Sequence, residues 1–168
     1  MGTRALAAVK SAGIKPAELV ALLNKAFADE WLAYYQYWLG AKVAAGVPKG
    51  EVIKELEEHA EEELEHAEML AERIIQLGGT PVLEPKVWYD VANCKYMPPK
   101  DPDIHTLLDQ NIRGEQCAIA VYYKLLDYTK EKDPITYDLI RKILKDEIEH
   151  EQDLEDLKRD LEMCAKKR

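Results

Sequence analysis

The sequence predicts an all-α protein, a four-helix bundle with one long crossover between its second and third helices. Two observations support this fold class. The chain of 168 residues is rich in Glu, Lys, Ala and Leu, with 33% charged and 47% apolar residues, as in long helices. Four long segments place apolar residues every three or four positions, which is the helical period. The length suits a single domain, with residues 1–15 as an N-terminal arm and residues 16–168 as the bundle.

The first two helices are expected to form an antiparallel pair. Pro16 suits the first position of a helix, and the apolar stripe that follows should end near Gly46, before Val47-Pro48. The second helix is expected from about Gly50 to Leu77. It should stop at Gly78-Gly79, because glycine commonly ends helices.

The crossover is the least regular part of the chain. Residues 78–102 contain five prolines and no sustained helical period, with room for a short helix at Trp88. Connections beyond about 12–15 residues are uncommon unless they have a purpose. Here the connection would let the third helix, Asp103 to Lys130, run parallel to the second. The fourth helix opens at Asp133-Pro134 and leaves no room for a fifth.

The composition argues against several classes of function. A net charge of −9 does not favour nucleic acid or an anionic membrane, but would gather cations. Arg4, Lys10 and Lys15 in the arm are interpreted as a solvated tail, so direct DNA binding is not expected. No apolar run approaches the roughly 20 residues of a membrane span, and the start does not resemble a secretory signal. We therefore expect a soluble, cytoplasmic protein.

Two five-residue stretches, 62–66 and 146–150, repeat the pattern acid, Glu, aliphatic, Glu, His. A lone Glu within an apolar helix precedes the Glu-x-x-His of each stretch, by 33 residues in the first case and 32 in the second. A helix–loop–helix unit is therefore used twice. Each copy supplies one Glu from its first helix and a Glu and a His from its second. The six candidate residues are Glu30, Glu63, His66, Glu115, Glu147 and His150.

The surroundings of these residues indicate a metal site. Glu63-x-x-His66 alone is typical of a solvated helix face, because its helix is so rich in Glu. Glu147 and His150, however, occupy core positions flanked by Ile143 and Leu154. Burying an unpaired carboxylate costs several kcal/mol, so four buried glutamates need counter-charge. Two divalent cations would balance them. Carboxylate and imidazole ligands without thiolate favour iron or manganese, as in known di-iron and di-manganese bundles.

With these motifs the chain resembles the ferritin superfamily over roughly residues 16–165. The Glu-x-x-His on both the second and the fourth helix is similar to bacterioferritin-type centres. Together with the lack of a fifth helix and the cysteine pair Cys94 and Cys117, it resembles the Dps-like proteins called thioferritins. The resemblance implies a ferritin-like bundle in which Glu30 and Glu115 are terminal ligands. The other implied ligands are Glu63 and Glu147, which bridge, and His66 and His150, one nitrogen each.

The resemblance also implies the function. Such proteins oxidise Fe(II) with peroxide or dioxygen, store Fe(III) inside a shell of twelve identical subunits and limit oxidative damage. It implies two iron ions per subunit, with manganese possible and no haem, and makes the six ligands the catalytic residues.

Three cysteines are too few and too scattered for a secreted disulfide scaffold. Cys117 lies two residues after Glu115, about 200° around the helix from the metal side, where the crossover carrying Cys94 must pass. Two buried, unreactive thiols are one interpretation. The resemblance implies instead a reversible Cys94–Cys117 disulfide, with Cys164 unpaired.

Other interpretations stay open. A manganese catalase or a rubrerythrin-like peroxidase could use the same ligands, although no C-x-x-C supports a self-contained rubrerythrin. A metal-free structural bundle would leave the four core glutamates unexplained. His59 is interpreted as an ordinary exposed helix histidine, with an auxiliary ligand or entry site as the alternative. Tyr34, Tyr37 and Tyr122 are interpreted as core packing, with hydrogen bonds to ligands or electron transfer as alternatives.

Overall fold

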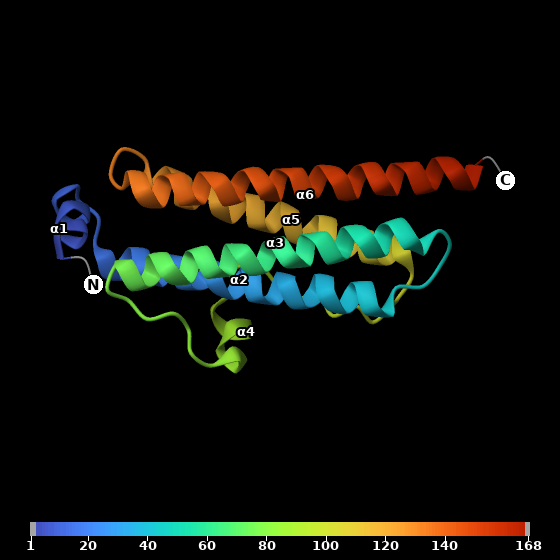
Figure 1. The fold of residues 1–168 in the computed structure, drawn as a ribbon, viewed down its shortest axis with the longest axis horizontal. Helices are drawn as coiled ribbons and strands as arrows, with labels where there is room; N and C mark the ends of the chain where they lie inside the picture. Colours follow the sequence, from blue (N-terminus) through green and yellow to red (C-terminus); the bar gives the residue numbers. More distant parts are fainter. Residues whose placement is uncertain (1–2, 167–168) are drawn as a thin grey trace.

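The computed structural model of the protein describes residues 3–166 and is all-α, as predicted (Figure 1). Four long helices carry the fold, and their bounds lie close to those expected from the sequence. A short 3-10 turn, η1 (Pro85–Val87), precedes the shortest helix. Within the described residues, no helix is long and apolar enough to cross a membrane. The helices are α1 (Thr3–Ser11), α2 (Pro16–Val43), α3 (Lys49–Gln76), α4 (Trp88–Val91), α5 (Ile104–Thr129) and α6 (Pro134–Lys166).

The four long helices form an up-down-down-up bundle (Figure 1). Helix α2 packs mainly against α3, and α5 packs mainly against α6. The crossover returns along the bundle from the end of α3 to the start of α5, so that these two helices run in the same direction. The connection predicted from the prolines of residues 78–102 is therefore confirmed.

The crossover is fastened to α2 by aromatic and polar contacts. The rings of Trp88 in α4 and Trp31 in α2 stack with centroids 5.1 Å apart. The carboxylate of Asp29 accepts hydrogen bonds from the backbone N–H of Cys94 and from the side chain of Asn93, both 2.7 Å long. Such contacts fix a long connection that would otherwise be mobile.

The N-terminal arm is not the solvated tail that its charges suggest. Residues 3–11 form α1, whose Val9 joins Ile14 in the hydrophobic cluster that contains Leu19 and Leu23 of α2. Burial of one apolar side chain contributes about 1.5–3 kcal/mol, which is enough to hold a short helix in place. The cations of the arm still face solvent.

The core consists of two hydrophobic clusters, one toward each end of the bundle. One contains Leu23, Leu70 and Ile143, and the other contains Leu56 and Leu154. Each long helix contributes to both clusters and carries polar buried residues between them. The fold therefore positions a polar layer at the middle of an otherwise apolar interior.

A buried ion pair joins the end of α3 to the start of α6. The guanidinium of Arg73 donates to Asp133 and to the hydroxyl of Thr136, with both contacts 2.7 Å long. Asp133 also accepts from the backbone N–H of Thr136, which caps the helix where the sequence places its start.

Candidate metal centre

The polar layer contains all six residues predicted as ligands, one or two from each long helix. Each is at most 3% exposed. The two Glu-x-x-His motifs project inward because residues three apart lie on nearly the same side of a helix. The residues are Glu30 of α2, Glu63 and His66 of α3, Glu115 of α5, and Glu147 and His150 of α6.

The six side chains form two overlapping groups of four. One is Glu30, Glu63, His66 and Glu147, and the other is Glu63, Glu115, Glu147 and His150. Within each group, one ligand atom per residue lies within 4.8 Å of the others. Glu63 and Glu147 belong to both groups, so each can offer one carboxylate oxygen to the first group and the other oxygen to the second.

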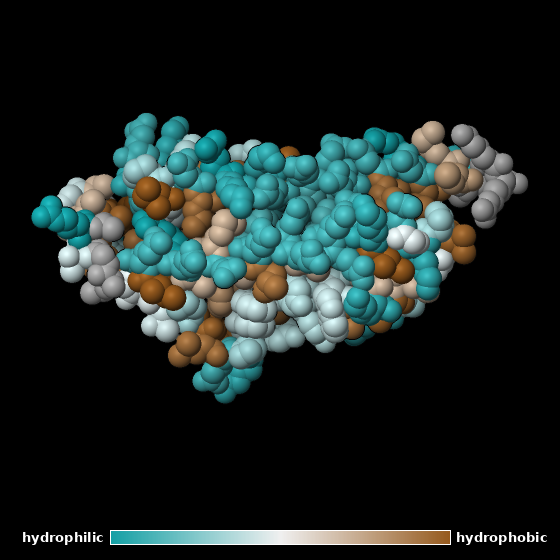
Figure 2. Space-filling view, in the orientation of Figure 1, coloured by the Kyte–Doolittle hydropathy of each residue, from teal (hydrophilic) through white to brown (hydrophobic). Residues whose placement is uncertain are grey.

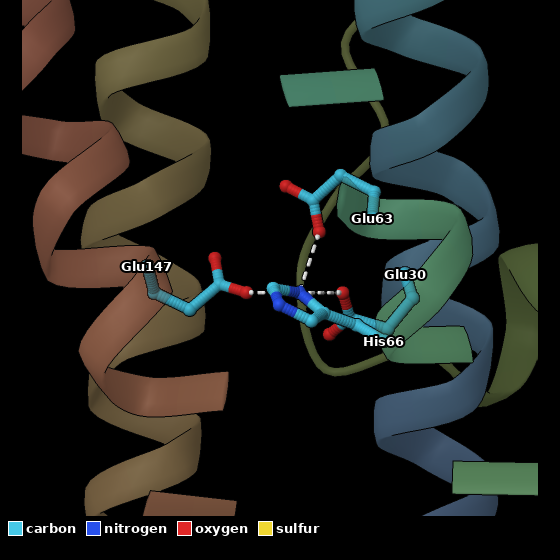
Figure 3. Close-up of side chains that lie close together, drawn as sticks. All are labelled: Glu30, Glu63, His66 and Glu147. Carbon is cyan, nitrogen blue, oxygen red and sulfur yellow. Dashed lines mark ion pairs between the residues drawn. The ribbon is translucent and has the colours of Figure 1, made fainter. Parts of the chain in front are cut away.

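The first group converges on the ring of His66 (Figure 3). Its Nδ1 lies 3.1 Å from an oxygen of Glu147, 3.4 Å from Glu30 and 3.5 Å from Glu63. In the second group, Nδ1 of His150 lies 3.6 Å from Glu63 and 4.0 Å from Glu115. The Nδ1 atom of each imidazole is therefore directed toward the carboxylates of its group.

The donor atoms of this layer fit two divalent cations. Six of them are buried without a hydrogen-bond partner among the described residues. An unpartnered buried polar atom is costly, typically about 1–3 kcal/mol and more when charged, so the sequence would not retain six without a compensating ligand. The unpartnered atoms are Oε2 of Glu30, both oxygens of Glu63, Oε1 of Glu147, and Nδ1 of His66 and of His150.

A carboxylate on the opposite helix orients each histidine. Nε2 of His66 lies 3.3 Å from Asp146, and Nε2 of His150 lies 2.5 Å from Glu62. These acids hold the rings so that Nδ1 faces the centre, as outer carboxylates commonly do for metal-binding histidines. Asp146 and Glu62 are the first acids of the two repeated stretches, and no role could be inferred for them from the repeat alone.

Two tyrosines donate hydrogen bonds to Glu30 and Glu115 in a reciprocal arrangement. The hydroxyl of Tyr37 in α2 donates to Glu115 in α5, and that of Tyr122 in α5 donates to Glu30 in α2. Both tyrosines are also buried core residues, so each side chain both packs in the core and hydrogen-bonds to a glutamate of the polar layer. Tyr34 makes no such contact and packs against the edge of Trp31.

Burial and mutual repulsion govern the protonation of the centre. Burial, followed by the charges of Glu63 and Glu147, raises the pKa of Glu30 well above its ordinary value. The pKa of Glu115 is raised in the same way. Burial disfavours the charged form of His150, but the nearby Glu63 and Glu147 raise its pKa to about 9. The cluster therefore holds protons that cations must displace.

The centre is approached from two sides of different character. A narrow cavity of about 40 Å³ leads in between α2 and α5 beneath the crossover, past Ala33, Tyr96 and Ala118. On the other side, α3 and α6 border an acidic hollow of about 510 Å³, and the surface over these helices is largely hydrophilic (Figure 2). A small neutral molecule suits the first approach, and a cation suits the second.

The cysteines pair as the resemblance implies. Cys94 of the crossover and Cys117 of α5 form a disulfide, and Cys164 is exposed and free. Cys94 also borders the narrow cavity, so the disulfide lies beside the first approach to the centre.

Three buried residues near the centre differ from the sequence-based interpretation. His59, interpreted as exposed, is only 3% exposed, because its ring stacks on that of His150 with centroids 4.1 Å apart. Asp29 and Gln36 received no role, although both hold the crossover. Gln36 accepts from the backbone N–H of Met97. Sequence patterns do not reveal such contacts, because the crossover has no regular period.

Comparisons with known proteins agree with this geometry. A family model described as a ferritin-like domain matches residues 20–164. The DNA protection during starvation protein of Pyrococcus furiosus is 41% identical over 152 residues, which cover 89% of this chain and 81% of that protein. The structure is similar to that of a dodecameric, bacterioferritin-related thioferritin from Bacteroides fragilis, with 43% identity, a TM-score of 0.96 and coverage of 99% and 98%. It is also similar to a bacterioferritin with a diiron site from Desulfovibrio desulfuricans, with 26% identity, a TM-score of 0.74 and coverage of 88% and 81%.

Proposed function

Because the chain belongs to the ferritin-like family, we propose that it is a ferroxidase that oxidises Fe(II) with peroxide or dioxygen and stores the Fe(III). The ligands are the six residues of the polar layer, and the same six are the catalytic residues. One observation carries the proposal: two groups of buried donors share Glu63 and Glu147 and leave their inward atoms without other partners.

The stoichiometry of the reaction suits a two-position centre. Reduction of one hydrogen peroxide to water takes two electrons and two protons, and each Fe(II) supplies one electron. Fe(II) is therefore a substrate that occupies both positions. The iron pair supplies the electrons, and the chain supplies the ligands, the charge balance and the exclusion of bulk water.

The protein groups have distinct tasks in this proposal. Glu63 and Glu147 face both positions and hold the two ions close together. Tyr37 and Tyr122 fix the orientation of the terminal glutamates by donating to one oxygen of each. Hard carboxylate oxygens tolerate the rise in iron charge, after which Fe(III) leaves toward an acidic surface.

The proposal includes assembly into a closed shell of twelve chains. It is supported by the similarity to the thioferritin of Bacteroides fragilis, described as dodecameric, across almost the whole length of both chains. Closed symmetric assembly is usual for homo-oligomers. Protection would come from removal of Fe(II) and peroxide rather than from DNA binding, since the chain has a net charge of −9.

The test is aerobic and peroxide-driven oxidation of Fe(II) by the assembled protein, with the iron retained per chain counted after gel filtration. We expect rapid oxidation and retention of far more iron than the centre itself holds. Catalytic loss of peroxide without iron retention would contradict the proposal. That outcome would favour a manganese catalase or a rubrerythrin-like peroxidase on the same ligands.

A further inference from the structure

A second cluster of metal-binding side chains lies beside the centre, on the side of the acidic hollow. Glu55 and His59 of α3 and Asp153 of α6 each place one ligand atom within 4.8 Å of the others. Glu55 and His59 are one helical turn apart, with Nε2 of His59 3.3 Å from Oε1 of Glu55. Three donors from two helices therefore converge on one point.

His59 is the unusual member of this cluster. Its side chain is 3% exposed, and its Nδ1 has no hydrogen-bond partner among the described residues. The ring is held by stacking on His150 and by the edge of Tyr37, with centroids 4.1 and 5.3 Å away. The residue also borders the acidic hollow, and its Nε2 is directed toward the carboxylate of Glu55. The ring is therefore fixed by stacking and by the contact of Nε2 with Glu55, while its Nδ1 is left without a partner among the described residues.

The internal repeat provides a comparison within the same chain. Glu63 and Glu147, like His66 and His150, are related by a shift of 84 residues. The same shift relates the Glu55, His59 and Asp153 cluster to Leu139, Ile143 and Met69, which pack in the hydrophobic core at the other end. The fold therefore does not require polar groups here, and the chain carries them in only one of the two equivalent places.

Among the described residues, the hollow beside the cluster carries far more negative than positive charge. The hollow is bordered by eight acids and one lysine, Lys145, which is already 2.9 Å from Glu149 and 3.6 Å from Asp146. Glu55 and Asp153 each place a carboxylate oxygen within 4.8 Å of the other, and like charges at this distance repel each other. A divalent cation would relieve this repulsion.

We propose that Glu55, His59 and Asp153 form a third divalent-cation site, through which iron passes between the acidic hollow and the two-metal centre. One imidazole and two carboxylates are ligands that suit iron, manganese or zinc. The stacked rings of His59 and His150 place this site directly beside the centre. The transit role rests on the function proposed above, whereas the binding of a cation does not.

Zinc(II) titration of the chelator-treated, assembled protein tests the binding, followed by anomalous diffraction at the zinc edge. We expect three ions per chain, the third between Glu55, His59 and Asp153. The informative variant is Glu55→Leu/His59→Ile/Asp153→Met, which copies the residues of the equivalent apolar place and should bind two. Asp153→Asn is the second variant. It changes a single residue that is less buried than His59, so the fold should be preserved.

Glu61→Gln is the matched control, since Glu61 borders the same hollow but belongs to no cluster. It should keep three ions. Two results would overturn the site: the absence of a third ion in the wild type, or loss of the third ion in Glu61→Gln as well as in the triple variant. Either result would indicate diffuse binding by the acidic residues instead. A third ion that persists in Glu63→Gln would support this site even if the two-metal centre failed.

Iron oxidation tests the transit role separately. Fe(II) is added to the Asp153→Asn protein in successive portions of two per chain, with peroxide after each. Because iron would enter the centre through this site, we expect every portion, the first included, to be oxidised several-fold more slowly than in the wild type. Wild-type rates in all portions would overturn the transit role.

Discussion

At the scale of single residues, the shared glutamates are the groups on which the centre depends most. We predict that Glu147→Gln slows Fe(II) oxidation at least about 100-fold, because outer partners of metal ligands alone are worth about 10–100-fold. The helical circular dichroism should stay unchanged. Glu149→Gln makes the same charge change on an exposed residue of the same helix and should keep the wild-type rate. Equal rates in the two variants would exclude Glu147 as a ligand.

The outer carboxylates give a second prediction at this scale. Asp146→Asn should weaken Zn(II) binding at the position of His66 by about 10–100-fold, since Asp146 orients that ring. Asp156→Asn, an exposed position on the same helix, serves as the control in a competition titration against a chelating dye. An Asp146→Asn affinity within twofold of the control would show that the ring needs no such partner.

At the scale of the elements, the crossover is held by both covalent and hydrogen-bonded contacts. Reduction of Cys94–Cys117, which joins residues separated by 23 positions in the sequence, should lower the free energy of unfolding by about 3 kcal/mol if loop entropy dominates. Thermal unfolding of the Cys94→Ser/Cys117→Ser protein at fixed concentration measures this, with Cys164→Ser as the control. The same unfolding temperature for both would show that Asp29 and Gln36 hold the crossover without the disulfide.

The long helices and the six residues of the polar layer could be predicted from the sequence, because both follow a regular spacing along the chain. The spacing of Leu19, Leu23 and Tyr37 indicates a helix face. The repeat indicates six acidic and imidazole side chains on such apolar faces, and the structure buries these six together. The packing of α1 could not be predicted, because Val9 and Ile14 bury their side chains only through contacts between distant elements. The burial of His59 depends in the same way on the ring of His150.

At the scale of the whole molecule, the stability should depend on pH and on metal together. The pKa of His150 is raised to about 9, so the stability that this shift contributes is present below about pH 6.5 and is lost as the pH rises through 9. The raised pKa values of Glu30 and Glu115 act in the same direction.

We therefore predict that chelator-treated protein unfolds at a lower temperature at pH 9 than at pH 6.5. Added Zn(II) should raise the unfolding temperature more at pH 9, since cations bind the deprotonated ligands of the folded state. Differential scanning calorimetry at the two pH values, with and without Zn(II), measures both effects. An unfolding temperature that rises with pH in the absence of metal would contradict the assigned protonation of the cluster.

The most direct measurement is anomalous diffraction at the iron edge from crystals of the assembled protein loaded with Fe(II) without oxygen. Two strong peaks per chain are predicted in the polar layer. One should lie among Glu30, Glu63, His66 and Glu147, and the other among Glu63, Glu115, Glu147 and His150. A single peak, or none, within this layer would contradict the central claim that these six residues bind a pair of iron ions.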